Sequence, residues 1–190
     1  MTQFPIDPTV HRREYSHANT VATCPNGDVI VNWRYNNTMA IINRETKKIT
    51  WSLNDISYGQ HHDVQMLGNG NMLFFANGAD VHIYGPETGS RVVELNPKNN
   101  QEVWSYSGSP PRSFFSWFIS GCQRLESGNT LICEGLWGRL FEVTPDKEIV
   151  WEYVSPYFVE YDHPAYKDTN IIFRCYRYGS DSPQIRGRLS

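Results

Sequence analysis

Imidazole, carboxylate and amide side chains gather in two short stretches of this chain, each followed by a turn and an apolar run. His17 and Asn19 belong to the first stretch, and His61, His62 and Asp63 belong to the second. A neutral imidazole acts as a nucleophile or as a base near neutral pH. The residue types therefore predict nucleophilic or general-base chemistry at these two places.

Arg34 and Gln60 complete the candidate site. Gln60 begins the second stretch, and Arg34 lies just beyond the apolar run that follows the first. A guanidinium there would clamp an anionic group beside the histidines. Three other histidines, taken singly, are interpreted as hydrogen-bonded structural residues: His11, His82 and His163.

Strand alternation predicts which of these side chains share a face. It puts His17 and Asn19 on one face of their strand. It puts His61 and Asp63 on one face of the other strand, with His62 on the opposite face. Because His17 and His61 head successive repeats of the chain, their pairing favours a functional role.

Three copies of one pattern of turns and apolar runs supply the elements that position these residues. Each copy has a Gly-containing turn, at residues 26–27, 69–70 and 127–128, ahead of an apolar run. Each predicts four short strands, the last of which holds a tryptophan: Trp51, Trp104 and Trp151. Such four-stranded meanders are typical of β-propeller blades, and an antiparallel sandwich is the alternative.

The chain is therefore predicted to be all-β, with β-propeller-type repeats of four-stranded antiparallel blades. Residues 1–15 form an N-terminal arm, residues 16–178 form about three full blades plus a partial fourth, and residues 179–190 form a C-terminal tail. The apolar run 170–178 is the partial blade, and the insertion 79–89 is either one wall of the site or a surface loop. Because this ring is open, we expect either the arm to pair with the last strand or a homo-dimer, unless the chain is a piece of a longer propeller.

Composition limits the classes of partner. The 190 residues include 17 Lys and Arg against 20 Asp and Glu, and the pI of about 6.1 does not favour nucleic acid as a ligand. No apolar run approaches the ~20 residues of a membrane helix and no export signal is evident, so no membrane partner is expected and the localisation stays open. The 4 cysteines lack a Cys-x-x-Cys pair and are expected to be buried free thiols.

These motifs, in this order, resemble those of the bacterial arylsulfate sulfotransferases. Residues 16–19 with Arg34 resemble the family's His-x-Asn motif and its downstream arginine. Gln60 and His61 resemble its Gln-His motif, whose histidine is sulfated during turnover. Three further stretches resemble the repeats of the same propellers: 120–132, 138–145 and 149–154.

The resemblance implies an enzyme that transfers a sulfuryl group from an aryl sulfate to a phenol through a sulfohistidine. It implies no cofactor and no metal, and its partners would be those two small molecules. His61 would be the nucleophile, with His17 and Arg34 as catalytic residues around the sulfuryl oxygens. Three residues would bind the substrate: Asn19, Gln60 and His62.

Two other classes of function stay open on the residues alone. One is a non-catalytic propeller that binds or assembles with a partner. The other is a metal-dependent lyase or hydrolase that acts on an anionic sugar. Its nitrogen-rich site would draw on four residues: His17, Gln60, either His61 or His62, and His163.

Overall fold

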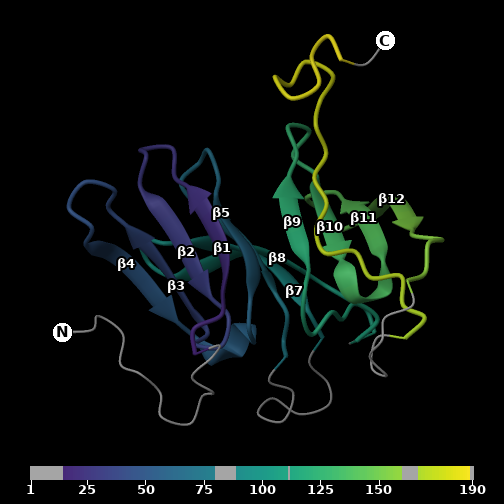
Figure 1. The fold of residues 1–190 in the computed structure, drawn as a ribbon, viewed down its shortest axis with the longest axis horizontal. Coiled ribbons are helices and arrows are strands. Elements are labelled where there is room, and N and C mark those ends of the chain that lie inside the picture. Colours follow the sequence, from purple (N-terminus) through teal and green to yellow (C-terminus); the bar gives the residue numbers. More distant parts are fainter. Residues whose placement is uncertain (1–14, 80–88, 111, 160–166, 189–190) are drawn as a thin grey trace.

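A computed structural model describes residues 15–79, 89–110, 112–159 and 167–188 (Figure 1). Some predictions concern residues outside these ranges: His11, His82, His163, nearly all of the arm and most of the insertion. Within them the chain folds into three four-stranded antiparallel sheets, which confirms the all-β prediction. Helix in this part of the chain is limited to two 3-10 turns, η2 (Ile56–Tyr58) and η3 (Gly135–Trp137), and none of it is long and apolar enough to cross a membrane.

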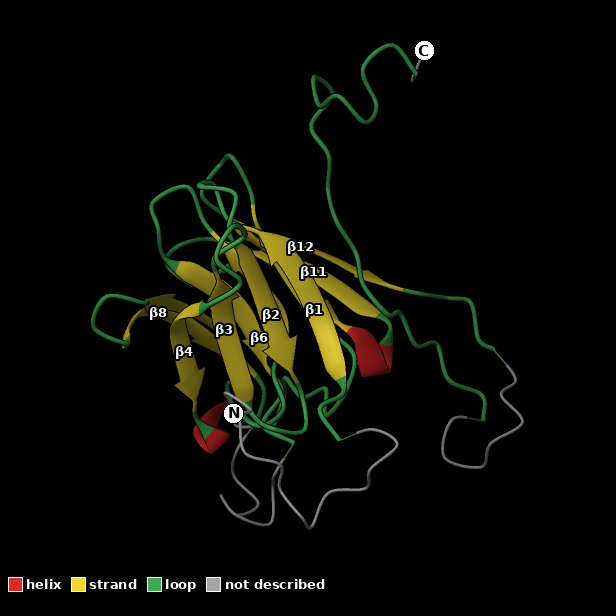
Figure 2. Cartoon of the chain, turned by 60° about the vertical axis from the view of Figure 1, so that its left-hand side comes forward, coloured by secondary structure: helices red, strands yellow, loops and turns green. Residues whose placement is uncertain are grey.

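Each sheet is a meander in which strands consecutive in the chain pair with one another (Figures 1 and 2). Sheet one consists of β1 (Ala18–Thr23), β2 (Val29–Trp33), β3 (Thr38–Ile42) and β4 (Ile49–Asn54). Sheet two consists of β5 (His62–Met66), β6 (Met72–Ala76), β7 (Arg91–Asn96) and β8 (Gln101–Ser107). Sheet three consists of β9 (Gly121–Arg124), β10 (Thr130–Glu134), β11 (Arg139–Val143) and β12 (Ile149–Val154).

Glycine closes the first hairpin of every sheet. Gly27, Gly70 and Gly128 have φ angles of 87°, 85° and 88°, a region that residues with a Cβ rarely adopt. The amide of Gly27 donates to Cys24, and those of the other two glycines donate to Leu67 and Leu125. The turns predicted at residues 26–27, 69–70 and 127–128 are therefore confirmed.

The tryptophans occupy equivalent places on the fourth strands, as predicted. Trp51, Trp104 and Trp151 each pair with the strand before it next to a register shift. Trp51 Nε1 donates to Asn100 Oδ1 at 3.1 Å, and Trp104 Nε1 donates to the carbonyl of Pro145 at 2.9 Å. Each of these two indoles thus ties its sheet to a turn of the next one.

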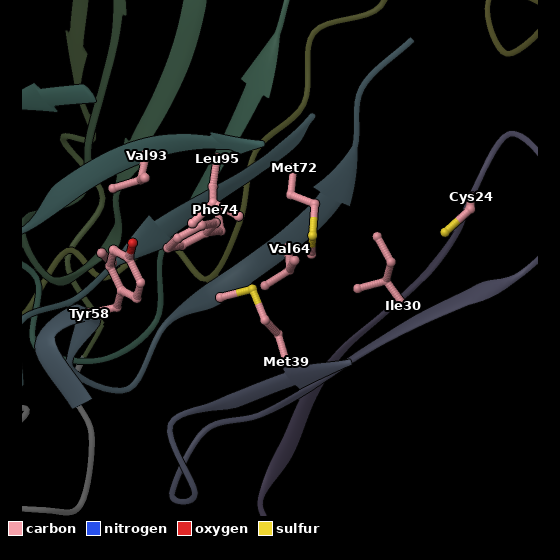
Figure 3. Close-up of a cluster of buried hydrophobic side chains, with 10 residues drawn as sticks. Cys24, Ile30, Met39, Tyr58, Val64, Met72, Phe74, Val93 and Leu95 are labelled. Atoms are coloured by element: carbon pink, nitrogen blue, oxygen red, sulfur yellow. The ribbon is translucent and has the colours of Figure 1, made fainter. Parts of the chain in front are cut away.

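Two apolar clusters lie between successive sheets, and β6 supplies both of them. All five residues of β6 are buried. Met72 and Phe74 point into the first cluster, between sheets one and two (Figure 3). Leu73 and Phe75 point into the second, between sheets two and three. A strand apolar at every position is what the alternation of side chains requires of a sheet that packs on both faces.

The run 170–178, predicted as a partial fourth blade, is extended but belongs to no β-ladder of the described residues. Its backbone contacts go to sheet three and η3, where the amide of Ile172 donates to the carbonyl of Gly135 at 2.9 Å. Figure 1 shows this segment running along sheet three. Because it forms no ladder within this part of the chain, separate backbone hydrogen bonds and side-chain contacts attach it.

Candidate active site

His62, the first residue of β5, is held through its Nδ1 atom. This nitrogen lies 2.7 Å from Asn77 Oδ1 and 3.1 Å from the carbonyl oxygen of Gln60. The amide of Asn77 is itself oriented, because its Nδ2 donates to the carbonyl of Ser116 at 2.7 Å and to Ser120 Oγ at 3.1 Å. Both partners of Nδ1 are therefore acceptors. It follows that Nδ1 carries the proton and that Nε2 carries the lone pair.

His62 is uncharged at neutral pH. Burial, partly opposed by the hydrogen bond to Asn77, lowers the pKa of its imidazole to about 4. The charge of Arg34 and the ring of His17 lower this pKa in the same direction. These two predicted site residues are therefore electrostatic neighbours of His62.

The first hairpin brings His17 and Arg34 together. The amide of Arg34 donates to the carbonyl of His17 at 3.1 Å, just outside the paired part of β1 and β2. Tyr35 lies against both side chains: its ring centroid is 5.0 Å from the Arg34 guanidinium carbon and 4.9 Å from the His17 ring. Arg34 is 92% shielded from solvent, since its exposed fraction is 8%. A guanidinium in such a shielded position binds an anion more strongly than one in water.

His61 lies elsewhere, inside the first apolar cluster. Its side chain is fully buried, with its ring centroid 5.8 Å from that of Phe74 and 6.4 Å from that of Tyr58. Neither ring nitrogen has a hydrogen-bond partner of good geometry among the described residues. Burial, followed by the neighbouring His62, lowers the pKa of His61 to about 4. The side chain of His61 thus lies among apolar rings, whereas that of His62 lies in the electrostatic field of Arg34 and His17.

The backbone explains why simple alternation does not apply here. Gln60 and Asp63 have φ angles of 59° and 54°, in the left-handed region, and the register between β5 and β6 shifts between His62 and Gln65. Such a bulge breaks the period of two. His61, which precedes β5, turns into the core as a result, while His62 and Asp63 turn towards polar partners.

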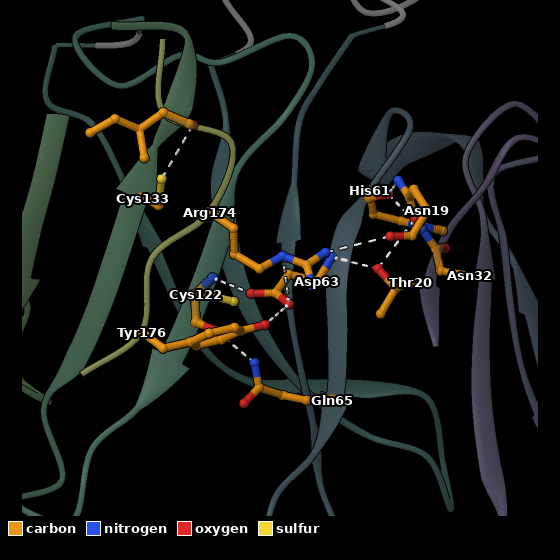
Figure 4. A network of polar contacts seen from close by, with 11 residues as sticks. Asn19, Thr20, Asn32, His61, Asp63, Gln65, Cys122, Cys133, Arg174 and Tyr176 are labelled. Atoms are coloured by element: carbon orange, nitrogen blue, oxygen red, sulfur yellow. Dashed lines mark hydrogen bonds and ion pairs between the residues drawn. The ribbon is translucent and has the colours of Figure 1, made fainter. Parts of the chain in front are cut away.

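Asn19 and Gln60 make hydrogen bonds that fix the backbone next to His62. Asn19 Nδ2 donates to the carbonyl of His61 at 3.0 Å, and Asn32 Nδ2 reaches the same oxygen at 2.6 Å (Figure 4). The amide of Gln60 donates to Asn37 Oδ1 at 2.6 Å. Both predicted residues therefore hold the turn that leads into His62.

Asp63 anchors the other side of this turn. Its backbone amide donates to Thr20 Oγ1 at 2.9 Å, and its carboxylate accepts from the amide of Cys122 at 3.0 Å and from the Tyr176 hydroxyl at 2.7 Å (Figure 4). Burial raises the pKa of this carboxyl, while Tyr176, Arg174 and the Cys122 amide lower it. Asp63 therefore joins sheets one and three to the strand that begins with His62.

Sequence reasoning missed Asn77, Ser120 and Tyr176. Asn77 stands before Gly78 at the end of β6, a pattern that indicates a turn, so its amide gave no sign of a partner. Ser120 and Tyr176 lie in separate parts of the chain, 43 residues after Asn77 and 113 residues after Asp63. No local pattern connects positions so distant.

A cavity of about 610 Å³ opens beside the loop that holds Asn77. Phe115 and Trp137 give it aromatic surface, and the indole of Trp137 is oriented by a 2.8 Å hydrogen bond to the carbonyl of Phe115. Ser116, whose carbonyl binds Asn77, is the next residue along the chain. Four more residues line the cavity: Arg112, Ser113, Glu134 and Arg139.

The described residues contain no group of three or more His, Cys, Asp or Glu side chains placed to hold a metal ion. His163, named above as a possible ligand, lies outside them. The cysteines are free, as predicted. Cys24, Cys122 and Cys133 are buried, and Cys175 is half-buried.

One family of known proteins matches most of the chain. The profile of the family described as Arylsulfotransferase (ASST) covers residues 6–156, which include both polar stretches and Asn77. No curated protein matches the chain at a significant level.

Several solved structures share the fold. A streptogramin B lyase aligns with a TM-score of 0.55 and 17% identity, over 75% of this chain and 42% of its own. Virginiamycin B lyase from Staphylococcus aureus aligns with a TM-score of 0.52 and 18% identity, over 76% and 43%. The WD40 β-propeller domain of Doa1 aligns with a TM-score of 0.51 and 11% identity, over 73% and 40%. At these identities the likeness shows the propeller fold alone, and the chain spans less than half of each of these structures.

Proposed function

Because this chain belongs to the arylsulfotransferase (ASST) family, we propose that it transfers a sulfuryl group from an aryl sulfate to a phenolic acceptor. We place the nucleophile at His62 Nε2 and not at His61, the histidine that the Gln-His resemblance suggested. The observation that carries this assignment is the hydrogen bond of His62 Nδ1 to Asn77, which leaves the lone pair on Nε2, in an imidazole whose pKa is affected by Arg34 and His17.

The first half of the reaction needs no proton removed from the nucleophile. The Nε2 lone pair of His62 attacks sulfur, the bond from sulfur to the aryl oxygen breaks, and the phenolate leaves with that electron pair. Arg34 binds the sulfuryl oxygens, and its planar fork matches two of them at once. His17, whose ring lies against Tyr35 beside Arg34, would hydrogen-bond to the departing oxygen.

Asn77 stabilises the charge that this attack creates. When Nε2 bonds to sulfur, the imidazole becomes cationic and its Nδ1 proton becomes more acidic. Asn77 Oδ1 and the Gln60 carbonyl already accept that proton's hydrogen bond, so the site is organised before charge develops. In the second half, a phenol oxygen attacks sulfur, the bond between sulfur and Nε2 breaks, and the phenolic proton passes to a base or to water.

The cavity lined by Phe115 and Trp137 supports an aromatic substrate. Flat rings pack well against such side chains in offset or edge-to-face geometry. Phe115 of this cavity precedes Ser116, whose carbonyl accepts from Asn77, the residue that holds His62 Nδ1. We assign it to the aryl group of the donor or of the acceptor.

The test is turnover of a chromogenic aryl sulfate with a phenol acceptor, together with intact-mass spectra of the quenched protein. The unmutated protein should gain about 80 Da, the mass of a sulfuryl group held on histidine. His62→Asn should lose both turnover and the adduct. His61→Asn is the matched comparison, and residual turnover is expected there because its side chain lies in the core.

Two results would contradict this proposal. If folded His61→Asn loses the adduct and His62→Asn retains it, the nucleophile is His61. If the unmutated protein turns over no aryl sulfate and gains no mass, the proposal fails, and a non-catalytic propeller becomes the better interpretation of the fold.

A further inference from the structure

The segment that follows sheet three reaches back to the strand of the proposed nucleophile. Its backbone is fixed at Ile172, which donates to Gly135, and at Arg177, whose amide donates to Gln123 Oε1 at 2.7 Å. Gln123 Nε2 returns a hydrogen bond to the carbonyl of Arg177 at 3.0 Å, and the Arg177 guanidinium pairs with Glu142. The residues between these attachments are therefore held in place.

Two side chains from this fixed stretch meet the carboxylate of Asp63 (Figure 4). The Tyr176 hydroxyl donates to Asp63 Oδ1 at 2.7 Å, and Arg174 Nε lies 3.6 Å from the same oxygen. The Asp63 side chain is 4% exposed, so the contact is shielded from water. A short hydrogen bond to a buried carboxylate is among the stronger polar contacts in a protein.

Close packing confines this carboxylate on its other side. The amide of Cys122 donates to Asp63 Oδ2 at 3.0 Å. Gly121 precedes it, and a Cβ added at this glycine would lie only 2.7 Å from the same oxygen. The carboxylate therefore fits one position between β9 and the C-terminal segment.

The position of Asp63 sets that of His62, its neighbour in the chain. Asp63 has a φ of 54°, and a residue other than glycine keeps such a conformation only where its surroundings impose it, at a cost of about 1–3 kcal/mol. Thr20 holds the amide of Asp63, and Tyr176 holds its carboxylate. The peptide that joins His62 to Asp63 is thus fixed from sheet one and from the C-terminal segment.

We propose that Tyr176 is a positioning residue for His62, acting through the carboxylate of Asp63. Tyr176 touches neither the imidazole nor, in this scheme, the substrate. Its hydroxyl keeps Asp63 in its left-handed conformation, and this keeps Nδ1 of His62 on Asn77 with Nε2 free to react. The inference rests on the proposed function for the identity of the reacting group, but the geometry it describes is independent of turnover.

The experiment compares Tyr176→Phe with Tyr178→Phe. Tyr178 is a matched control because it lies two residues further along the same segment and is 48% exposed. Long-range ¹H–¹⁵N spectra of the histidine side chains report the tautomer of His62, and steady-state kinetics report kcat and KM. In the unmutated protein and in Tyr178→Phe, the spectra should show one tautomer, protonated at Nδ1.

In Tyr176→Phe the His62 signals should shift towards exchange between tautomers. Its kcat should fall by about ten-fold while KM changes by less than about two-fold, because substrate contacts are untouched. A purely structural role would lower the melting temperature and leave the His62 signals and kcat unchanged, and that result would overturn the proposal. If the unmutated protein has no turnover, the tautomer shift alone still decides the positioning role, while the proposed function fails separately.

Arg174→Gln carries the same test if Tyr176→Phe does not fold. It removes the 3.6 Å ion pair from the same oxygen of Asp63, and its side chain is 28% exposed, so the change is milder. The same displacement of the His62 signals is expected, with a fall in kcat of about three-fold. Unchanged His62 signals in this folded variant would refute the coupling between the C-terminal segment and His62.

Discussion

Replacing His61 with leucine should remove part of the pH dependence of stability. A buried imidazole with a pKa near 4, against 6.5 in the unfolded chain, resists protonation in the folded state. As pH falls below 6.5 the unfolded state binds the proton first, so stability is greatest above that pH and is lost as pH falls towards 4. Between pH 7 and pH 5 this one group costs about 2 kcal/mol of unfolding free energy. His61→Leu should abolish that share of the loss.

Urea denaturation at pH 7 and at pH 5 measures the effect, provided that the denaturant dependence is unchanged. Leucine places an apolar group among Phe74 and Tyr58, so the variant should be at least as stable as the unmutated protein at pH 7. His61→Gln is the control: it also loses the pH dependence, but it buries an amide without partners at a cost of about 1–3 kcal/mol. His61→Leu could instead lose as much stability between the two pH values as the unmutated protein does. In that case His61 is not a neutral core residue, and the different roles given to His61 and His62 are wrong.

Three other outcomes are expected. Arg34→Lys keeps the charge but loses the planar fork, so aryl sulfate turnover should fall by about ten-fold or more, and unchanged kcat/KM would contradict the role of an anion clamp. Trp104→Phe removes the hydrogen bond to Pro145 and should lower the unfolding free energy by about 1 kcal/mol, whereas Val103→Thr, a change at its exposed neighbour, should lower it far less. Phe74→Ala should cost about 3–5 kcal/mol in chemical denaturation because its side chain is fully buried in the first cluster, and a cost under 1 kcal/mol would mean that this core is loosely packed.

The repeating architecture could be predicted because its signals are local. The glycine of each first hairpin, which adopts a φ near 87°, can be predicted from the two-residue turn in which it stands. A tryptophan likewise indicates the fourth strand within each copy. The continuous apolar run 72–75 likewise indicates a strand that is buried on both faces. Each signal lies within a few residues of the feature it predicts.

The arrangement of the site could not be predicted in the same way. Asp63, within the bulge between His62 and Gln65, hydrogen-bonds to Thr20 and Tyr176, which lie elsewhere in the chain, and no pattern near His62 reveals these partners. Without the bulge, alternation puts His61 and Asp63 on one face and His62 on the other. Motif and alternation thus led to the stretch that contains both histidines, and the proposal of His62 over His61 rests on the contacts of Asn77.

Strand β6 is buried on both faces, and this has a consequence for how the molecule folds. Met72 and Phe74 complete the core shared with sheet one, while Leu73 and Phe75, between and beside them in the chain, complete the core shared with sheet three. Until both sheet one and sheet three have docked, a folded sheet two leaves at least one row of these side chains exposed to water. Repeat proteins unfold sheet by sheet only when each unit is stable with one neighbour, and here the middle unit depends on two. The three sheets should therefore melt in one cooperative transition, and a fragment that ends after β8 should expose Phe75 and associate with itself.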